Sequence, residues 1–142
     1  MSGTIVRVLP RTDFPYYQQT GLAAGQTTGE VVIATNVDLS MYREATLIAR
    51  LHPSTNWAGG ASVTIRARAS AATPEDPGLT FRITSATLGS LTFTQGTDSA
   101  PALKLAALPA NAGGAMDITI QAQQVTSTTM IVGLSIDLSL KS

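Results

Sequence analysis

The sequence predicts an all-β protein, built as a single β-sandwich of about eight strands with jelly-roll or Greek-key connections. Three observations lead to this class: apolar and polar residues alternate in several segments, turn-rich connections separate these segments, and no stretch shows a convincing helical period. The chain has 142 residues, which is enough for one domain with a substantial core.

The clearest alternation lies in residues 128–141. Every even position from 130 to 140 is apolar, and most odd positions are polar. A period of two places the apolar residues on one face of a β-strand. We therefore expect the core row to be buried and Ser135 and Asp137 to face outward; the core row consists of Val132, Leu134, Ile136 and Leu138.

Shorter segments of β character precede it. The expected strands are residues 4–9, 30–39, 44–52, 61–69, 81–84, 88–94, 102–108 and 115–123. The first is expected to be an edge strand that stops at Pro10, and Pro53 is expected to end the third. Segments 44–52 and 61–69 have matching faces and a loop of moderate length between them, so we expect them to form a hairpin.

A segment without sustained period, residues 10–29, reads PRTDFPYYQQTGLAAGQTTG and contains two prolines and three glycines. It is typical of an extended arm or long loop. The predicted division is therefore an N-terminal strand and arm, residues 1–29, followed by a β-sandwich domain, residues 30–142. The arm carries Phe14, Tyr16 and Tyr17, which either fold back onto the domain or dock on a neighbouring subunit.

Composition excludes several classes of function. Nine basic and nine acidic residues give a net charge of zero, and charged residues make up 13% of the chain against about 25% in typical domains. No basic footprint for nucleic acid, no signal peptide and no membrane-spanning run is expected. The absence of cysteine excludes disulfides and thiolate chemistry. A nearly uncharged surface suits a protein that works inside an assembly.

Candidate catalytic groups are few. His52 is the only histidine, no GxSxG motif accompanies it, and metal sites of the cysteine or histidine type are impossible with this inventory. Asp117 and Asp137 are expected on the outward rows of strands, where an acid aids solubility. We therefore expect no enzyme activity, no cofactor and no metal.

Candidate partner-binding residues fall into two groups. Arg50, Arg66 and Arg68 share the outward face of the predicted hairpin, where they form either a solvated face or a small basic patch for an acidic protein surface. The aromatic group consists of Phe14, Tyr16, Tyr17 and Trp57. In a carbohydrate-binding module, Tyr16, Tyr17 and Trp57 would serve as stacking platforms for a sugar.

The arm RTDFPYYQQTG, the strands EATLIARL and ASVTIRARA and the connection ATPEDPG lie in a cysteine-free chain rich in alanine, threonine and glycine. In this combination the chain resembles the capsid decoration (cement) proteins of tailed bacteriophages. The resemblance implies a structural virion protein, made in the host cytoplasm, that binds the major capsid protein on the outside of an assembled shell and stabilises it. It implies a homo-oligomer, with a trimer favoured, and no catalytic residues. The alternative is a carbohydrate- or protein-binding β-sandwich module, such as a tail or receptor-binding component.

Overall fold

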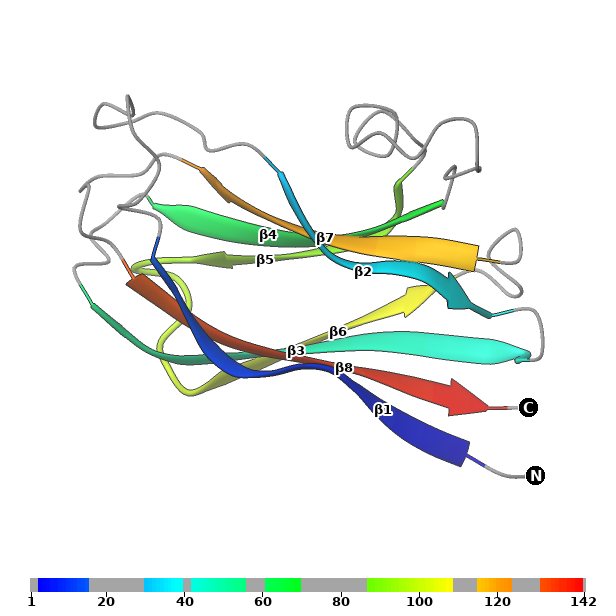
Figure 1. Ribbon diagram of the computed structural model, residues 1–142. Helices are drawn as coiled ribbons and strands as arrows, with labels where there is room; N and C mark the ends of the chain where they lie inside the picture. The colour runs from blue at the N-terminus through cyan, green and yellow to red at the C-terminus, as the bar shows by residue number, and fades with distance from the viewer. Residues whose placement is uncertain are drawn as a thin grey trace.

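The computed structural model describes residues 3–15, 30–39, 42–55, 61–69, 87–108, 115–123 and 131–141. Within these ranges the chain forms strands and no helix; the strands are β1 (Gly3–Pro15), β2 (Val31–Asp38), β3 (Glu44–Thr55), β4 (Ser62–Ala69), β5 (Thr87–Thr94), β6 (Ala102–Leu108), β7 (Ala115–Gln123) and β8 (Ile131–Lys141). They form two four-stranded sheets that lie face to face (Figure 1). The predicted β-sandwich is confirmed.

The strand order identifies the topology. One sheet has the order β1-β8-β3-β6 and is called the β8 sheet here; the other has the order β2-β7-β4-β5 and is called the β7 sheet. The antiparallel pairs β1–β8, β2–β7, β3–β6 and β4–β5 together form one long ribbon, with the first half of the chain running against the second. This ribbon is wound so that β3 also meets β8 and β4 also meets β7. Such a wound ribbon is a jelly roll, one of the two topologies that the sequence predicted.

The core lies between the two sheets and follows the predicted alternation. The inward residues of β3, β4, β7 and β8 are buried, as predicted; they are Ala45, Leu47, Ala49, Leu51, Val63, Ile65, Ala67, Met116, Ile118, Ile120, Ala122, Val132, Leu134, Ile136 and Leu138. Phe93 of β5 is also fully buried. Small alanines and larger aliphatic side chains interdigitate across the sandwich, as close packing of two sheets requires.

The predicted hairpin between residues 44–52 and 61–69 is wrong. β3 pairs with β8 and β6, whereas β4 pairs with β7 and β5, so these two strands belong to different sheets. Among the described strands only β4 and β5 are both consecutive in sequence and paired. The matching faces misled the prediction because every strand that lines a shared core has the same alternation, whichever strand is its partner.

Two prolines do not end their strands. β1 continues through Pro10 to Pro15, and its pairing with β8 shifts register between Arg7 and Leu9 and again between Leu9 and Thr12. β3 continues through Pro53 to Thr55, beyond the point where its pairing with β6 ends. In both places the chain has a neighbouring strand on one side only, where a missing backbone N–H is tolerated. The edge position predicted for the first strand is confirmed.

The first part of the predicted arm, residues 10–15, is therefore strand, and the backbone of Phe14 pairs with Val132. The rest of the arm, with Tyr16 and Tyr17, lies outside the described residues, as do Trp57 and the expected strand at 81–84. The division of the chain at residue 29 stays a prediction.

Candidate interaction surfaces

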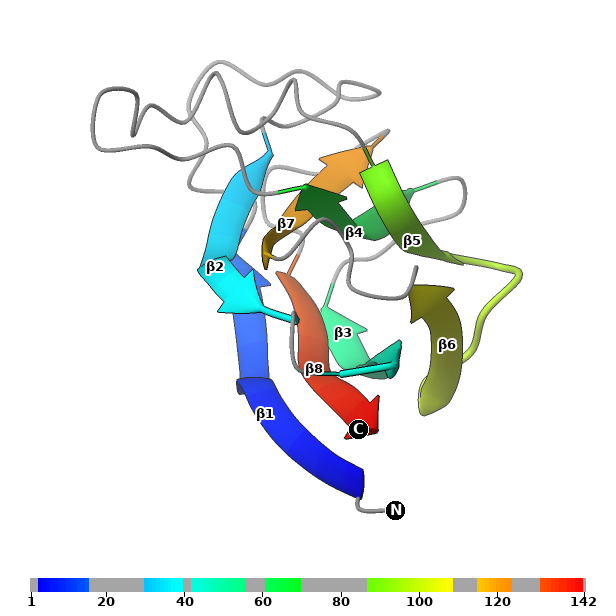
Figure 2. The same ribbon diagram turned by 90° about the vertical axis from the view of Figure 1, so that its right-hand side faces the viewer.

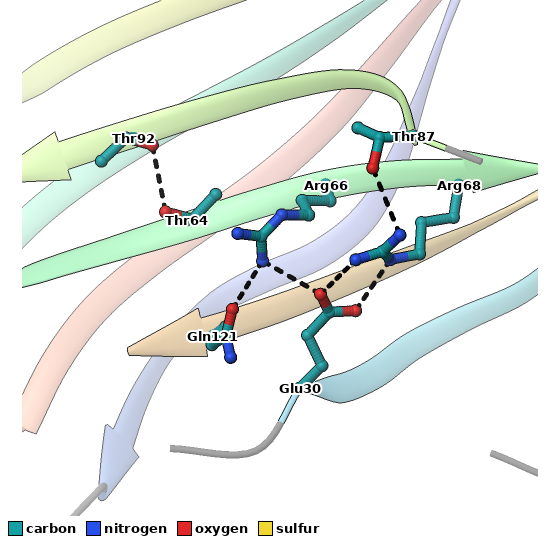
Figure 3. Close-up of polar contacts among 7 residues, drawn as sticks. All are labelled: Glu30, Thr64, Arg66, Arg68, Thr87, Thr92 and Gln121. Atoms are coloured by element: carbon teal, nitrogen blue, oxygen red, sulfur yellow. Dashed lines mark hydrogen bonds and ion pairs between the residues drawn. The ribbon is translucent and has the colours of Figure 1, made fainter. Parts of the chain in front are cut away.

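The outer face of the β7 sheet carries a closed ion cluster. The carboxylate of Glu30 accepts hydrogen bonds from Arg66 Nη1 at 3.0 Å and from Arg68 Nε and Nη2 at 2.9 and 2.6 Å (Figure 3). Arg66 Nη1 also donates to Gln121 Oε1 at 2.7 Å. The Glu30 side chain is 4% exposed and the two arginine side chains are 19% and 13% exposed. Both arginines are thus held in place by neighbours rather than offered to a ligand.

The protonation of Glu30 follows from this environment. Burial by itself raises the pKa of a carboxyl group, because the charged form loses its hydration. The hydrogen bond from Arg68 and the positive charges of Arg68 and Arg66 outweigh that effect and hold the pKa of Glu30 below its ordinary value of 4.5. Glu30 is therefore a carboxylate at neutral pH.

The cluster also explains why a predicted outward acid is buried. Glu30 precedes β2, the arginines come from β4, and β7 lies between those two strands. The arginine side chains therefore cross β7 to reach Glu30. Beneath them Asp117 and Thr119, which lie opposite Arg68 and Arg66 in the β4–β7 register, are 0% exposed. Asp117 does lie on the outward row of β7, as expected, but it is buried, so the expectation of a solvated acid is wrong.

A second ion cluster lies on the outer face of the β8 sheet. Asp137 of the central strand β8 accepts hydrogen bonds from Arg7 Nε on β1 and from Arg50 Nη1 on β3, the latter at 2.9 Å. The Asp137 side chain is 5% exposed, whereas the side chains of Arg7 and Arg50 are 55% and 46% exposed. Asp137 and Ser135 do face outward, but both are buried, so the expectation that Asp137 is a solvated acid is wrong.

His52 belongs to the same outer face, where an imidazole nitrogen, Nε2, lies 3.0 Å from Ser135 Oγ. A base beside a hydroxyl is the geometry of an activated nucleophile. Ser135 is only 3% exposed, however, and a nucleophile must be reachable by its substrate. The acid on the same row, Asp137, is engaged by two arginines. The pair therefore acts as a bridge between β3 and β8, and the expectation of no catalysis stays a prediction.

The predicted basic patch does not exist as such. Arg50 lies on the outer face of the β8 sheet, while Arg66 and Arg68 lie on the outer face of the β7 sheet, at the opposite side of the sandwich. Each group also pairs with a buried carboxylate, Asp137 or Glu30. Because β3 and β4 are in different sheets, the parity that placed the three arginines together has no meaning across them.

Among the described residues, the exposed large apolar side chains lie on the two edge strands of the β8 sheet, β1 and β6. Leu103 and Leu105 of β6 are 55% and 59% exposed, and they alternate with residues that point toward the core. Their outer-face neighbours in the β3–β6 register are Arg50 and Ile48, and Ile48 is half-buried. We call Ile48, Leu103 and Leu105 the apolar strip. It borders the arginine that binds Asp137, so apolar and positively charged groups share one surface.

The neighbouring side of the sandwich, where β5 and β6 form the two sheet edges, is closed by a lysine. Lys104 Nζ donates to the backbone carbonyl of Thr92 at 2.7 Å, lies 3.2 Å from the carboxylate of Asp98 and sits 5.5 Å from the centre of the Phe93 ring. β5 also approaches β6 so closely that a Cβ at Gly89 would lie 2.8 Å from a methyl carbon of Leu108. The inward lysine thus occupies one backbone acceptor of β5 and places a charge between the two edges, which disfavours the addition of a foreign strand.

Other classes of site find no support in the described part of the chain. Its histidine and acidic residues form no group of three or more that could hold a metal ion. None of its residues forms a helix long and apolar enough to cross a membrane.

Comparison with known proteins yields similar folds. No protein-family model and no curated protein matches the chain by sequence. Among solved structures, it is similar to a chain of the disulfide-linked pili of Bacillus endospore appendages, with 14% identity, a TM-score of 0.47, and 100% of this chain and 91% of that chain covered. It is also similar to the K1 cleaved adhesin domain of Lys-gingipain from Porphyromonas gingivalis W83, with 11% identity and a TM-score of 0.46. That match covers 100% of this chain and 99% of the other.

A chain of Desmodium yellow mottle tymovirus gives 16% identity, a TM-score of 0.36, and coverage of 100% of this chain and 89% of that chain. These three structures come from a pilus, an adhesin and a virus. At these identities and scores they carry no argument about the role of this chain.

Several residues of these surfaces were not found from the sequence. Glu30, Gln121, Leu103 and Leu105 were not singled out, and Asp137 was assigned to solvent. The period of two does place Leu103 and Leu105 on one row of their strand. However, the other row of this strand contains Lys104 between Ala102 and Ala106, and a row with a lysine is normally the outer one. The sequence therefore did not indicate that Leu103 and Leu105 face outward. The ion clusters depend on strand order and left no local signal.

Proposed function

We propose that this chain is a structural virion protein that decorates an assembled phage shell by binding its outer surface. The observation that carries the proposal is the apolar strip of Ile48, Leu103 and Leu105 beside Arg50 on the β8 sheet. The resemblance to capsid decoration proteins supports the same role. In this proposal the partners are the major capsid protein and further copies of the chain, with the trimer that the resemblance implies, and the location is the capsid surface.

The energetics of the strip favour a protein partner. Burying a leucine side chain that was fully exposed stabilises a complex by about 1.5–3 kcal/mol, and the two leucines of the strip already expose more than half of their surface. Arg50 next to them supplies the residue type most often enriched with aromatic anchors at the centres of interfaces. Because the chain has no net charge, docking on a large shell adds no long-range repulsion.

The test is co-sedimentation with empty shells of tailed phages. We expect the wild-type chain to pellet with a cognate shell at a fixed stoichiometry and to raise the temperature at which that shell opens. The double variant Leu103→Lys/Leu105→Lys should lose this binding while keeping its fold, because both side chains are exposed. A matched control is Thr92→Lys, an exposed position on the outer face of the other sheet.

Binding that the double variant retains would contradict a contact through the apolar strip. A chain that pellets with no shell but binds an immobilised glycan would instead support the carbohydrate-binding alternative. Among the described residues, the polar groups on the outer face of the β7 sheet are not available to bind a sugar, because they hydrogen bond to one another; these groups are Glu30, Arg66, Arg68 and Gln121. Its stacking platforms would have to be Tyr16, Tyr17 or Trp57.

A further inference from the structure

The sandwich has four sheet edges, and they differ in how they are protected. The β5 and β6 edges are closed by Lys104. β2 pairs with β7 through two register shifts, which interrupt a regular ladder. The second half of β1 contains Pro10 and two register shifts of its own. Prolines, bulges and inward charges are the devices that keep foreign strands from adding to an edge.

The first half of β1, Gly3–Arg7, has none of these devices within the described part of the chain. Its register with β8 is regular from Gly3 to Arg7, and the strand order places no described strand on its other side. Figure 2 shows this end of β1 extending past β2. It also carries the most exposed large apolar side chains outside the strip, Ile5 at 68% and Val6 at 42%. A regular, apolar edge strand is a template for strand addition.

We infer that this edge pairs with the same edge of a second copy of the chain, Gly3–Arg7 against Gly3–Arg7, antiparallel and centred on Ile5. The occupant of a strand edge must itself be a strand, because only a strand satisfies the row of backbone N–H and C=O groups along it. A two-fold pairing joins two β8 sheets into one continuous sheet.

The side chains fit this register. Residues directly opposite each other in a sheet point to the same face, so Ile5 must face an outward residue of the second copy. Centring on Ile5 places Ile5 opposite Ile5, Thr4 opposite Val6 and Arg7 opposite Gly3. β-branched residues are thereby paired with each other, no like charges lie opposite, and Arg7 stays bound to Asp137 beside a residue with no side chain. The neutral chain adds no overall repulsion.

The contact is short, so the dimer is expected to be weak. Stable complexes bury about 1,200–2,000 Å² of surface in total, and the area buried by pairing five residues of a strand edge is at most at the low end of this range. The inference does not rest on the proposed virion role, since the edge is available in either case. The pairing also leaves the apolar strip free to bind a shell protein. In a trimer built through other surfaces, each chain would still pair through its β1 edge with a chain of another trimer.

The experiment measures mass against concentration by sedimentation equilibrium for the full chain. Wild type should associate reversibly, and Ile5→Lys should raise the dissociation constant by at least about tenfold because it places two lysines opposite each other. Ile5→Glu should do the same alone, and an equal mixture of the Lys and Glu variants should associate again. Ala107→Lys, an exposed position on the outer face of β6 that is not part of the apolar strip, should leave the association unchanged.

A second measurement uses the absence of cysteine. In the Ile5→Cys variant the only thiols are the two that face each other across the pair, so mild oxidation should give a covalent dimer, while Ala107→Cys should give far less. The inference is overturned by a chain that stays monomeric at every concentration, by an oligomer that Ile5→Lys does not weaken, or by cross-linking as efficient from residue 107 as from residue 5. Failure of shell binding alone would leave this result untouched.

Discussion

Each sheet of this sandwich holds one buried carboxylate between two arginines, but the two clusters differ in what happens to the arginines. Around Glu30 the arginine side chains are 19% and 13% exposed, and around Asp137 they are 55% and 46% exposed. The carboxylates themselves are about equally buried. The same ionic grouping therefore closes one outer face and leaves the other available to a partner.

The position of the acid explains the difference. Glu30 precedes an edge strand, and its partners lie on β4, so the ion pairs span β7 and lie flat over it. Asp137 sits on the central strand itself, and Arg7 and Arg50 come from the strands on either side. Their guanidinium groups converge on a short side chain from two directions and keep their outer surfaces in water. The acid next to the edge strand therefore links β4 to the start of β2 across β7, whereas the acid on a central strand leaves two partly exposed guanidinium groups on the surface.

The largest expected effect is in the core beneath the clusters, which both sheets share. Ile136→Ala next to Asp137 and Ile118→Ala next to Asp117 should each lower the free energy of unfolding by about 2–5 kcal/mol, because both side chains are fully buried. Denaturation by urea measures both. A loss under about 0.5 kcal/mol at either site, the range of surface substitutions, would show that one sheet does not contribute to the core.

The second-largest effect on stability is expected at the closed cluster, which Glu30 forms with Arg66 and Arg68. Glu30→Gln keeps the shape and one acceptor oxygen but removes the charge that Arg66 and Arg68 share, so it should cost about 1–3 kcal/mol of unfolding free energy. The control is Glu44→Gln, whose side chain is 69% exposed and lies 3.9 Å from Lys141, and it should cost less than about 0.5 kcal/mol. Equal effects of the two substitutions would contradict the structural role of the Glu30 cluster.

Acid should reproduce the effect of the Glu30→Gln substitution. Since the pKa of Glu30 is lowered below 4.5 in the folded protein, its stabilisation is complete above about that pH and is lost as the pH falls through the folded-state pKa. The difference in unfolding free energy between wild type and Glu30→Gln should therefore shrink as the pH is lowered from neutral to well below 4.5. A difference that stays constant over this range would mean that Glu30 is not ionised in the folded state.

The smallest effect is expected at the Asp137 cluster, called the open cluster here because the side chains of both its arginines are about half exposed. Asp137→Asn should cost less than about 1 kcal/mol, because both of its arginines are largely exposed and solvent screens their charge. The comparison with Glu30→Gln is made by denaturation at low and high salt, and only the open cluster should respond strongly to salt. If Asp137→Asn proved as costly as Glu30→Gln, the two clusters would be structurally equivalent and the contrast between them would fail.

The positions of most strands and the identity of the core residues could be predicted from the sequence. The period of two in residues 130–140 and 115–123 was enough to place Ile136, Ile118 and their neighbours inside, because side-chain direction along a strand is a local property. The all-β class and the edge position of β1 followed from the same kind of local pattern.

The pairing of the strands, and with it the arrangement of side chains on the outer faces, could not be predicted from the sequence. Arg7 and Asp137, 130 positions apart, meet because β1 lies beside β8, and Arg50 is separated from Arg66 because β3 and β4 belong to different sheets. Pairing depends on backbone hydrogen bonds between distant segments, and backbone groups are the same in every strand. A row of side chains can therefore show which face is buried in the core, but the partner strands determine what covers the other face.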